Sequence, residues 1–342
     1  MGDGGAMMMP AAEAPLGEEA SAAPVKVVGG AAGPLAEMEL TEEAKMRGPS
    51  PLRRLAPLLQ VEDIIWLAGG LPNAAAFPLT SLTATLYDGT VIEIGGAGAG
   101  LLYDAQQYMT KNLGHSPLVG WCEEHMRLLH GALPNHRCIL TAGSTCSGDL
   151  AMRLLCESGR TVMLTEWYTY PNFTSSVKPL GVPIVPVAMD EGGLVPAAME
   201  ESIRGIMAGA SPPSSLILYI GTCGQNPTGH TYSRERLTEL YAVARRHDVI
   251  IIEDDPYMYL SFPRDGGAEA PGLYGLSSCG GGGDRCSLLS IDEDARVIRM
   301  DTFSKVSDRL PHARTRARTH SLAHLLTPPS RSSSRPACAA AG

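Results

Sequence analysis

Four short polar motifs carry the residue types that could do chemistry in this chain. They are Thr141-Ala142-Gly143-Ser144-Thr145, Asn226-Pro227-Thr228-Gly229, Asp254-Asp255-Pro256-Tyr257 and Thr302-Phe303-Ser304-Lys305. The first precedes a helical stretch, so its amides and hydroxyls could hold an anion. The last brings one of only five lysines to the end of a strand-like run. Taken singly, each has an ordinary interpretation: a plain turn for Asn226, an ion pair with an arginine for Asp254, and a solvated lysine for Lys305.

The elements that must position these motifs alternate between strand-like runs and amphipathic stretches after Leu140. The strand-like runs are TVMLTE (161–166), PIVPVAMD (183–190), LILYI (216–220), VIIIEDD (249–255) and RVIRMD (296–301). Helical spacing occurs over 146–156, 196–207 and 233–247, the last with Ser233 placed as an N-cap. The alternation predicts an α/β fold with a mostly parallel sheet and helices on both faces. Because ligands bind beyond the carboxyl ends of such strands, we expect the motifs to meet at one edge.

One cofactor, pyridoxal 5′-phosphate, accounts for all of these motifs together. It needs an anion cradle, an acid for the ring nitrogen, a donor for the ring hydroxyl, an aromatic ring beside its own and a lysine for its aldehyde. The other four lysines lie in the leader or at its edge, or lack such motifs around them; they are Lys26, Lys45, Lys111 and Lys178. We therefore interpret Lys305 as the lysine that reacts with the aldehyde.

The stretches GST, TYP, NPTG, EDDPY and TFSK, in this order, resemble those of fold-type I aminotransferases of class I/II from about Arg47 to Val306. Finer matches are PSPLR (49–53), WLAGGLPN (66–73), QNPTG (225–229), IIEDDPYMYL (251–260) and RVIRMDTFSKV (296–306). These are similar to the aromatic amino acid and 2-aminoadipate/kynurenine aminotransferases. The resemblance implies a pyridoxal-phosphate transferase type I large domain and a homodimer. It also implies transamination of such amino acids with a 2-oxo acid acceptor, 2-oxoglutarate being the expected one.

The resemblance also implies a role for each site residue. Lys305 would be catalytic: it would bind the cofactor aldehyde and then move the proton at the substrate α-carbon, a task suited to a desolvated lysine. Asp254 would hold the proton on the ring nitrogen. Tyr257 and Asn226 would contact the ring hydroxyl, and Tyr170 would stack on the ring. The phosphate would lie among Ser144, Thr145, Thr302 and Ser304.

Three further residues are expected to bind substrate by the same resemblance. Arg53, in PSPLR, would meet the side-chain carboxylate of a dicarboxylic substrate, for which its fork is suited. Gly70 would bring backbone close to the substrate. Tyr108, in QQY, would reach the site of the partner subunit, with Tyr103 as the competing choice.

Composition excludes several classes of protein. The net charge is -9, which argues against a general nucleic-acid surface. No uncharged apolar run approaches the length of a membrane span. The eight cysteines form no CxxC pair, so reduced thiols are expected and no metal site is predicted. The N-terminus lacks the pattern of a signal or transit peptide, so the cytoplasm is the expected compartment, with an organelle left open.

The sequence divides into three expected parts. Residues 1–45 read as a disordered leader, and 46–306 as the large domain with an N-terminal arm and a hairpin flap at 83–94, where Asp88-Gly89 favours a tight turn. Residues 307–342 hold six arginines and one acidic residue and read as a basic disordered tail. His312 stands where the family has a phosphate-binding arginine. The expected small C-terminal domain is missing, which suggests a truncated or mis-spliced product.

Two functions follow from these expectations. The chain is either a pyridoxal-phosphate aminotransferase or a catalytically inactive aminotransferase-like chain that lacks the arginines for the phosphate and the substrate carboxylate. A nucleotide-binding α/β protein is a third interpretation. It would need a phosphate loop, and the spacing of Gly95, Gly96, Gly98 and Gly100 does not provide one.

Overall fold

The computed structural model of the chain describes residues 40–48, the single positions 51, 55, 58, 61, 63 and 70, and then 72–95, 100–108, 113–131, 133, 136–260 and 287–307. All of them belong to one compact unit, Ala32–Gly342. The expected tail from residue 308 onward and the expected leader up to residue 39 lie outside the described residues.

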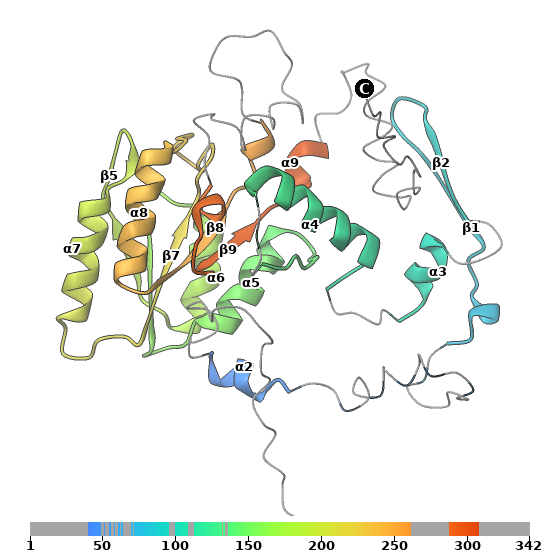
Figure 1. Cartoon of the computed structure of the whole chain (residues 1–342), viewed down its shortest axis with the longest axis horizontal. Helices are drawn as coiled ribbons and strands as arrows, with labels where there is room; N and C mark the ends of the chain where they lie inside the picture. The colour runs from blue at the N-terminus through green and yellow to red at the C-terminus, as the bar shows by residue number, and fades with distance from the viewer. Residues whose placement is uncertain are drawn as a thin grey trace, which may run out of the picture. The chain divides into compact units, whose positions relative to one another are not determined.

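A five-stranded parallel sheet forms the centre of this unit (Figure 1). In spatial order its strands are β4 (Ile184–Val187), β3 (Thr161–Glu166), β7 (Ser215–Ile220), β8 (Val249–Asp254) and β9 (Val297–Met300). The chain passes from β3 to β4 toward one edge of the sheet and from β7 through β8 to β9 toward the other edge. The direction of strand order therefore reverses between the neighbouring strands β3 and β7. The carboxyl ends beside such a reversal are the usual place for a ligand in an α/β sheet.

Alternating side chains of the strands supply two hydrophobic cores, one on each face of the sheet. In β7, Leu216, Leu218 and Ile220 enter the core shared with helices α7 (Pro196–Met207) and α8 (Arg234–Arg246). Ile217 and Tyr219 enter the core shared with helices α5 (Ser144–Leu155) and α6 (Pro171–Val177). Figure 1 shows these two pairs of helices on opposite sides of the strands. The predicted α/β fold is confirmed: a parallel sheet with helices on both faces.

Local sequence signals explain where several helices begin. Ser233 caps α8, because its hydroxyl accepts a hydrogen bond from the Arg236 amide at 3.2 Å. Pro196 and Pro171 occupy the first positions of α7 and α6, where their missing N–H groups cost nothing. Gly143 precedes α5 with φ +88°, a backbone angle that glycine adopts readily.

Several elements differ from the expectations drawn from the sequence. The run 183–190 splits into β4 and the short β5 (Met189–Asp190), which pairs antiparallel with β6 (Gly193–Leu194). Pro186 is tolerated within β4 because β4 is an edge strand.

Helix α2 (Glu42–Met46) begins before the expected end of the leader. The buried Thr41 hydroxyl donates to the Arg153 carbonyl at 2.7 Å, which fixes this segment on α5. Helices α4 (Ser116–His130) and α6 were not predicted.

The predicted flap is an antiparallel hairpin of β1 (Ser81–Thr85) and β2 (Val91–Gly95). Within its turn only Gly89 has a positive φ, and Asp88 instead accepts a hydrogen bond from the Thr90 amide at 3.0 Å.

The remaining described elements are η2 (Ala74–Ala76), α3 (Leu101–Gln106), η3 (Lys178–Leu180), η4 (Met258–Leu260), η6 (Leu289–Ile291) and α9 (Ser304–Ser307). Among the described helices, none combines the length and apolar character needed to cross a membrane.

Candidate active site

A pocket of about 330 Å³ lies at the carboxyl ends of β3, β7, β8 and β9, beside the start of α5. This volume falls at the lower end of the range of about 300 to 1,000 Å³ for small-molecule sites. The pocket brings together the predicted catalytic lysine and all eight predicted cofactor residues. They are Ser144, Thr145, Tyr170, Asn226, Asp254, Tyr257, Thr302, Ser304 and Lys305.

Asp254 ends β8 and directs one carboxylate oxygen to a neighbouring tyrosine. The Tyr219 hydroxyl donates to Asp254 Oδ2 at 2.6 Å, whereas Oδ1 is buried and has no hydrogen-bond partner among the described residues. Burial raises the pKa of Asp254 above its ordinary value, and the hydrogen bond from Tyr219 acts in the opposite direction. One oxygen is thus held in place while the other remains available to a donor in the pocket.

Lys305 lies in the short helix α9, directly after β9. Its Nζ is 5.9 Å from the centre of the Tyr257 ring, so the amine and the ring share the pocket. The side chain is exposed, contrary to the expected desolvated lysine.

The start of α5 supplies the expected anion cradle. The first amides of a helix have no partner within it and carry the positive end of its dipole. Ser144 Oγ is buried beside them without a hydrogen-bond partner among the described residues. Across the pocket, Thr302 Oγ1 accepts a hydrogen bond from the Ser304 amide at 3.2 Å, which orders the hydroxyls of that segment.

A buried acid that the sequence analysis did not select supports the loop after β7. Glu166, 1% exposed, accepts hydrogen bonds from the Tyr232 hydroxyl at 2.6 Å and from Gln225 Nε2 at 2.9 Å. Gln225 Oε1 in turn accepts from the Thr228 amide at 3.0 Å, which orders the turn that carries Asn226. The same signal that selected Asp254, an acid at the end of an apolar strand, was available for Glu166.

The aromatic partner of Asp254, Tyr219, was also missed. Tyr219 and Phe173 stack with ring centres 3.6 Å apart and planes 6° apart, and both line the pocket. Tyr170 also lines it, and its hydroxyl accepts a hydrogen bond from Asn172 Nδ2 at 2.8 Å. The alternation of LILYI places Tyr219 on the same face as Asp254, so this neighbour could be found only once the strand pairing was known.

The three predicted substrate residues are not brought to this pocket by the described chain. Arg53 lies outside the described residues. Gly70 is described, with φ +60°, but it does not line the pocket. Tyr108 is 67% exposed and does not line it either, and it was expected to serve a partner subunit. The competing Tyr103 packs against Phe77, with ring centres 5.6 Å apart.

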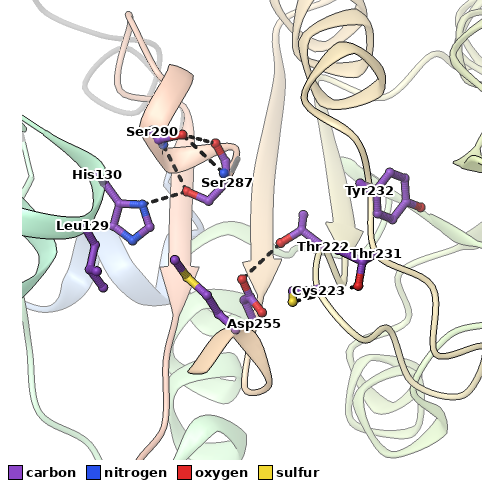
Figure 2. Close-up of a pocket in the computed structure, with 10 residues that line it drawn as sticks. Leu129, His130, Thr222, Cys223, Thr231, Tyr232, Asp255, Ser287 and Ser290 are labelled. Carbon is purple, nitrogen blue, oxygen red and sulfur yellow. Dashed lines mark hydrogen bonds between the residues drawn. The ribbon is translucent and has the colours of Figure 1, made fainter. Parts of the chain in front are cut away.

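A second, much smaller pocket of about 20 Å³ is lined by residues that include His130, Thr222, Asp255 and Ser287 (Figure 2). His130 Nδ1 is 3.0 Å from the Ser287 hydroxyl, and burial lowers the pKa of His130 to about 2. Thr222 lies between Glu253 and Asp255, and burial raises the pKa of Asp255 to about 7. The space suits about one water molecule, so it is no alternative to the larger pocket.

Comparison with known proteins identifies the family. The family model described as "Aminotransferase class I and II" matches residues 111–306, more than half of the 342-residue chain. The chain belongs to this aminotransferase family. The family inferred from the motifs is thereby confirmed, and pyridoxal 5′-phosphate is its cofactor.

Individual relatives of this aminotransferase chain come from fungi and mammals. An aromatic amino acid aminotransferase of Schizosaccharomyces pombe is 33% identical over 289 residues, covering 78% of this chain and 60% of that protein. The mitochondrial kynurenine/alpha-aminoadipate aminotransferase of Mus musculus is 32% identical over 284 residues, with the same coverage. Aminotransferase Aro8 from Candida albicans has 30% sequence identity to this chain, and its crystal structure matches the fold with a TM-score of 0.65, covering 78% of this chain and 60% of that one. The chain spans about 60% of the length of these relatives.

The described residues fit the family's cofactor in three respects. Asp254 Oδ1 is a buried acceptor without a described partner, which suits a ring N–H. Ser144 Oγ is likewise buried and lacks a described partner beside a helix start, which suits a phosphate oxygen. Lys305 supplies an amine at the same pocket. The described residues contain no group of three or more potential metal ligands.

Proposed function

We propose that this chain carries out pyridoxal-phosphate-dependent transamination of aromatic amino acids, 2-aminoadipate or kynurenine. The acceptor in this proposal is a 2-oxo acid, with 2-oxoglutarate as the first candidate. One observation carries the proposal: Lys305, the orphaned oxygen of Asp254 and the helix-start cradle at Ser144 line the same pocket. Relatives named for these substrates support the choice of donors.

In this proposal the residues of the pocket have different chemical roles. When bound, the cofactor supplies an aldehyde for the substrate amine and a ring that withdraws electrons from the α-carbon. Asp254 Oδ1 holds the proton on the ring nitrogen, and Tyr219 keeps that carboxylate oriented. Lys305 Nζ takes the proton from the substrate α-carbon, which requires the neutral amine.

The remaining groups bind and orient. The amides at the start of α5, with Ser144, Thr145, Thr302 and Ser304, hold the phosphate. Tyr257 and Asn226, which line the pocket, would contact the ring hydroxyl, and Tyr170 would pack on the ring. Arg53, Gly70 and the partner's counterpart of Tyr108 meet the substrate. Arg53 binds a side-chain carboxylate in this proposal. Arg53→Lys would therefore weaken the binding of 2-aminoadipate more than the binding of an aromatic substrate.

The proposal extends to the organisation of the chain. The large domain includes α2, which the Thr41 hydroxyl fixes on α5, and extends to residue 306; the residues before Thr41 act as a leader and 307–342 as a tail outside the family pattern. The active form is a homodimer, and the compartment is the cytoplasm. The mouse relative is named as mitochondrial, so organelle fractions belong in the localisation experiment.

Turnover by the purified full chain tests the proposal. The chain is incubated with cofactor, 2-oxoglutarate and, separately, tyrosine, kynurenine or 2-aminoadipate, and formation of glutamate is measured. We expect glutamate with at least one donor, none with Lys305→Ala, and unchanged rates with Lys178→Ala, an exposed lysine outside the pocket. No glutamate from the wild-type chain would contradict catalysis and favour the alternative of an inactive aminotransferase-like chain.

A further inference from the structure

A buried guanidinium joins three carboxylates on the face of the sheet opposite Asp254. Arg299 in β9 has a side chain that is 2% exposed. Its Nη2 donates to Asp255 Oδ2 at 2.9 Å and its Nε to Asp301 Oδ2 at 3.0 Å. Its Nη1 lies 3.1 Å from Glu253 Oε1. One side chain thus bonds to the segment after β8 and to the segment after β9.

Two of these carboxylates, Glu253 and Asp255, are also bonded to other segments of the chain. Glu253 accepts hydrogen bonds from the amides of Leu288 and Leu289 at 2.9 and 3.1 Å. The hydroxyl of Thr222 lies 2.9 Å from Glu253 Oε1 and 3.3 Å from Asp255 Oδ2, as Figure 2 shows for the latter residue. The cluster therefore links the segment after β7, β8, β9 and the start of η6 through these side chains and two backbone amides.

The residues of the pocket directly follow members of this cluster in sequence. Asp254 lies between Glu253 and Asp255 and points to the other face, because neighbouring side chains of a strand alternate. Asp301 precedes the segment that holds Thr302, Ser304 and Lys305. Arg299 itself does not line the pocket, so it touches no bound molecule there.

We propose that Arg299 is a positioning residue that sets the separation between Asp254 and Tyr257 on one segment and Lys305 on the other. This inference rests on the proposed function. The planar guanidinium bonds to Asp255 and Asp301 in fixed directions, and a lysine ammonium at the same place would keep the charge without that geometry. The two segments then lose their common support while the buried carboxylates keep a cation.

The chain offers a matched control in the residue directly before the same strand. Arg296 is 3% exposed and pairs with Asp294 through Nε and Nη2, both at 2.8 Å. Its Nη1 also donates to the Val249 carbonyl at 3.1 Å. This arginine lies at the amino end of β9, away from the pocket residues, so Arg296→Lys reports the general loss from changing a buried, paired arginine.

The experiment compares Arg299→Lys with Arg296→Lys in the full chain. Cofactor affinity is measured by titration, stability by denaturant unfolding, and amide hydrogen exchange over 254–257 and 301–305 in the cofactor-free chain. We expect Arg299→Lys to bind cofactor at least about tenfold more weakly than Arg296→Lys, a difference of about 1.4 kcal/mol. We also expect faster exchange in both segments only for Arg299→Lys.

Two results would overturn the inference. One is cofactor affinity of Arg299→Lys within twofold of the wild type. The other is a loss of cofactor affinity that is proportional to the loss of stability, with the same proportion in Arg299→Lys and Arg296→Lys. If Arg299→Lys does not fold, Asp301→Asn removes one of its partners while keeping an acceptor oxygen, and the same exchange and affinity changes are expected. If the wild-type chain binds no cofactor, the proposed function fails, whereas the exchange measurement still decides the role of Arg299.

Discussion

The hydrogen bond from Tyr219 to Asp254 can be removed without disturbing the packing around it. In Tyr219→Phe the ring remains and keeps its stacking on Phe173, but the hydroxyl 2.6 Å from Asp254 Oδ2 is lost. A hydrogen bond to a charged group contributes about 1.5 to 3 kcal/mol. At about 1.4 kcal/mol for each factor of ten, cofactor affinity should fall by about 10- to 100-fold.

The pH dependence of binding should shift in a definite direction. Burial already raises the pKa of Asp254, and Tyr219 opposes that rise, so its removal raises the pKa further. Binding of a protonated ring nitrogen requires the ionised carboxylate, and affinity therefore falls as the pH drops through this pKa. In Tyr219→Phe the fall should begin at a higher pH than in the wild type.

Tyr241→Phe is the matched control for this prediction. The Tyr241 hydroxyl also lies against carboxylates, at 2.9 Å from Asp292 and 2.6 Å from Asp294, but Tyr241 does not line the pocket. Cofactor titrations over the acidic and neutral range are measured for both variants. Equal cofactor affinities and equal pH midpoints for Tyr219→Phe and the wild type would refute the reasoning. An equal loss of cofactor affinity in Tyr219→Phe and Tyr241→Phe would also refute it.

Three further substitutions test the supporting structure. Ser233→Ala removes the N-cap of α8 and should lower the free energy of unfolding by about 1 kcal/mol in urea titrations; an unchanged midpoint would count against the cap. Gly193→Ala should cost on the order of 3 kcal/mol, because φ is +90° and a Cβ would lie 2.5 Å from the Tyr232 ring; stability within about 1 kcal/mol of the wild type would contradict that clash. Gln225→Ala should weaken cofactor binding about tenfold by freeing the turn that carries Asn226, with stability less affected, and calorimetric titration would show no change if the turn is held by other groups.

The strands and the central motifs could be predicted from sequence because their signals are local. The run 161–166 coincides with β3, and 216–220 lies within β7, since apolar runs of that length bounded by turns favour buried strands. The cofactor residues could be grouped in one pocket because parallel strands bring their carboxyl ends to one edge. The helical repeat over 196–207 likewise coincides with α7.

What the sequence did not predict depends on contacts between distant residues. The partnership of Tyr219 with Asp254 and that of Glu166 with Tyr232 join positions 35 and 66 residues apart. Neither follows from a periodic pattern, because strand neighbours must be known first. The break between β4 and β5 was missed because both halves favour strands, and only the separate pairing of β5 with β6 divides them. The exposure of the Lys305 side chain likewise could not be predicted, because it depends on the tertiary surroundings of α9.

The central claim, that this pocket binds the family's cofactor through Lys305, can be tested by chemical trapping. The full chain is incubated with pyridoxal 5′-phosphate, reduced with borohydride, digested and analysed by mass spectrometry. We expect the mass of the reduced cofactor on Lys305, with no more than trace labelling of Lys45 and Lys178, which are described and lie outside the pocket. Equal labelling of these three lysines, or none at Lys305, would contradict the claim.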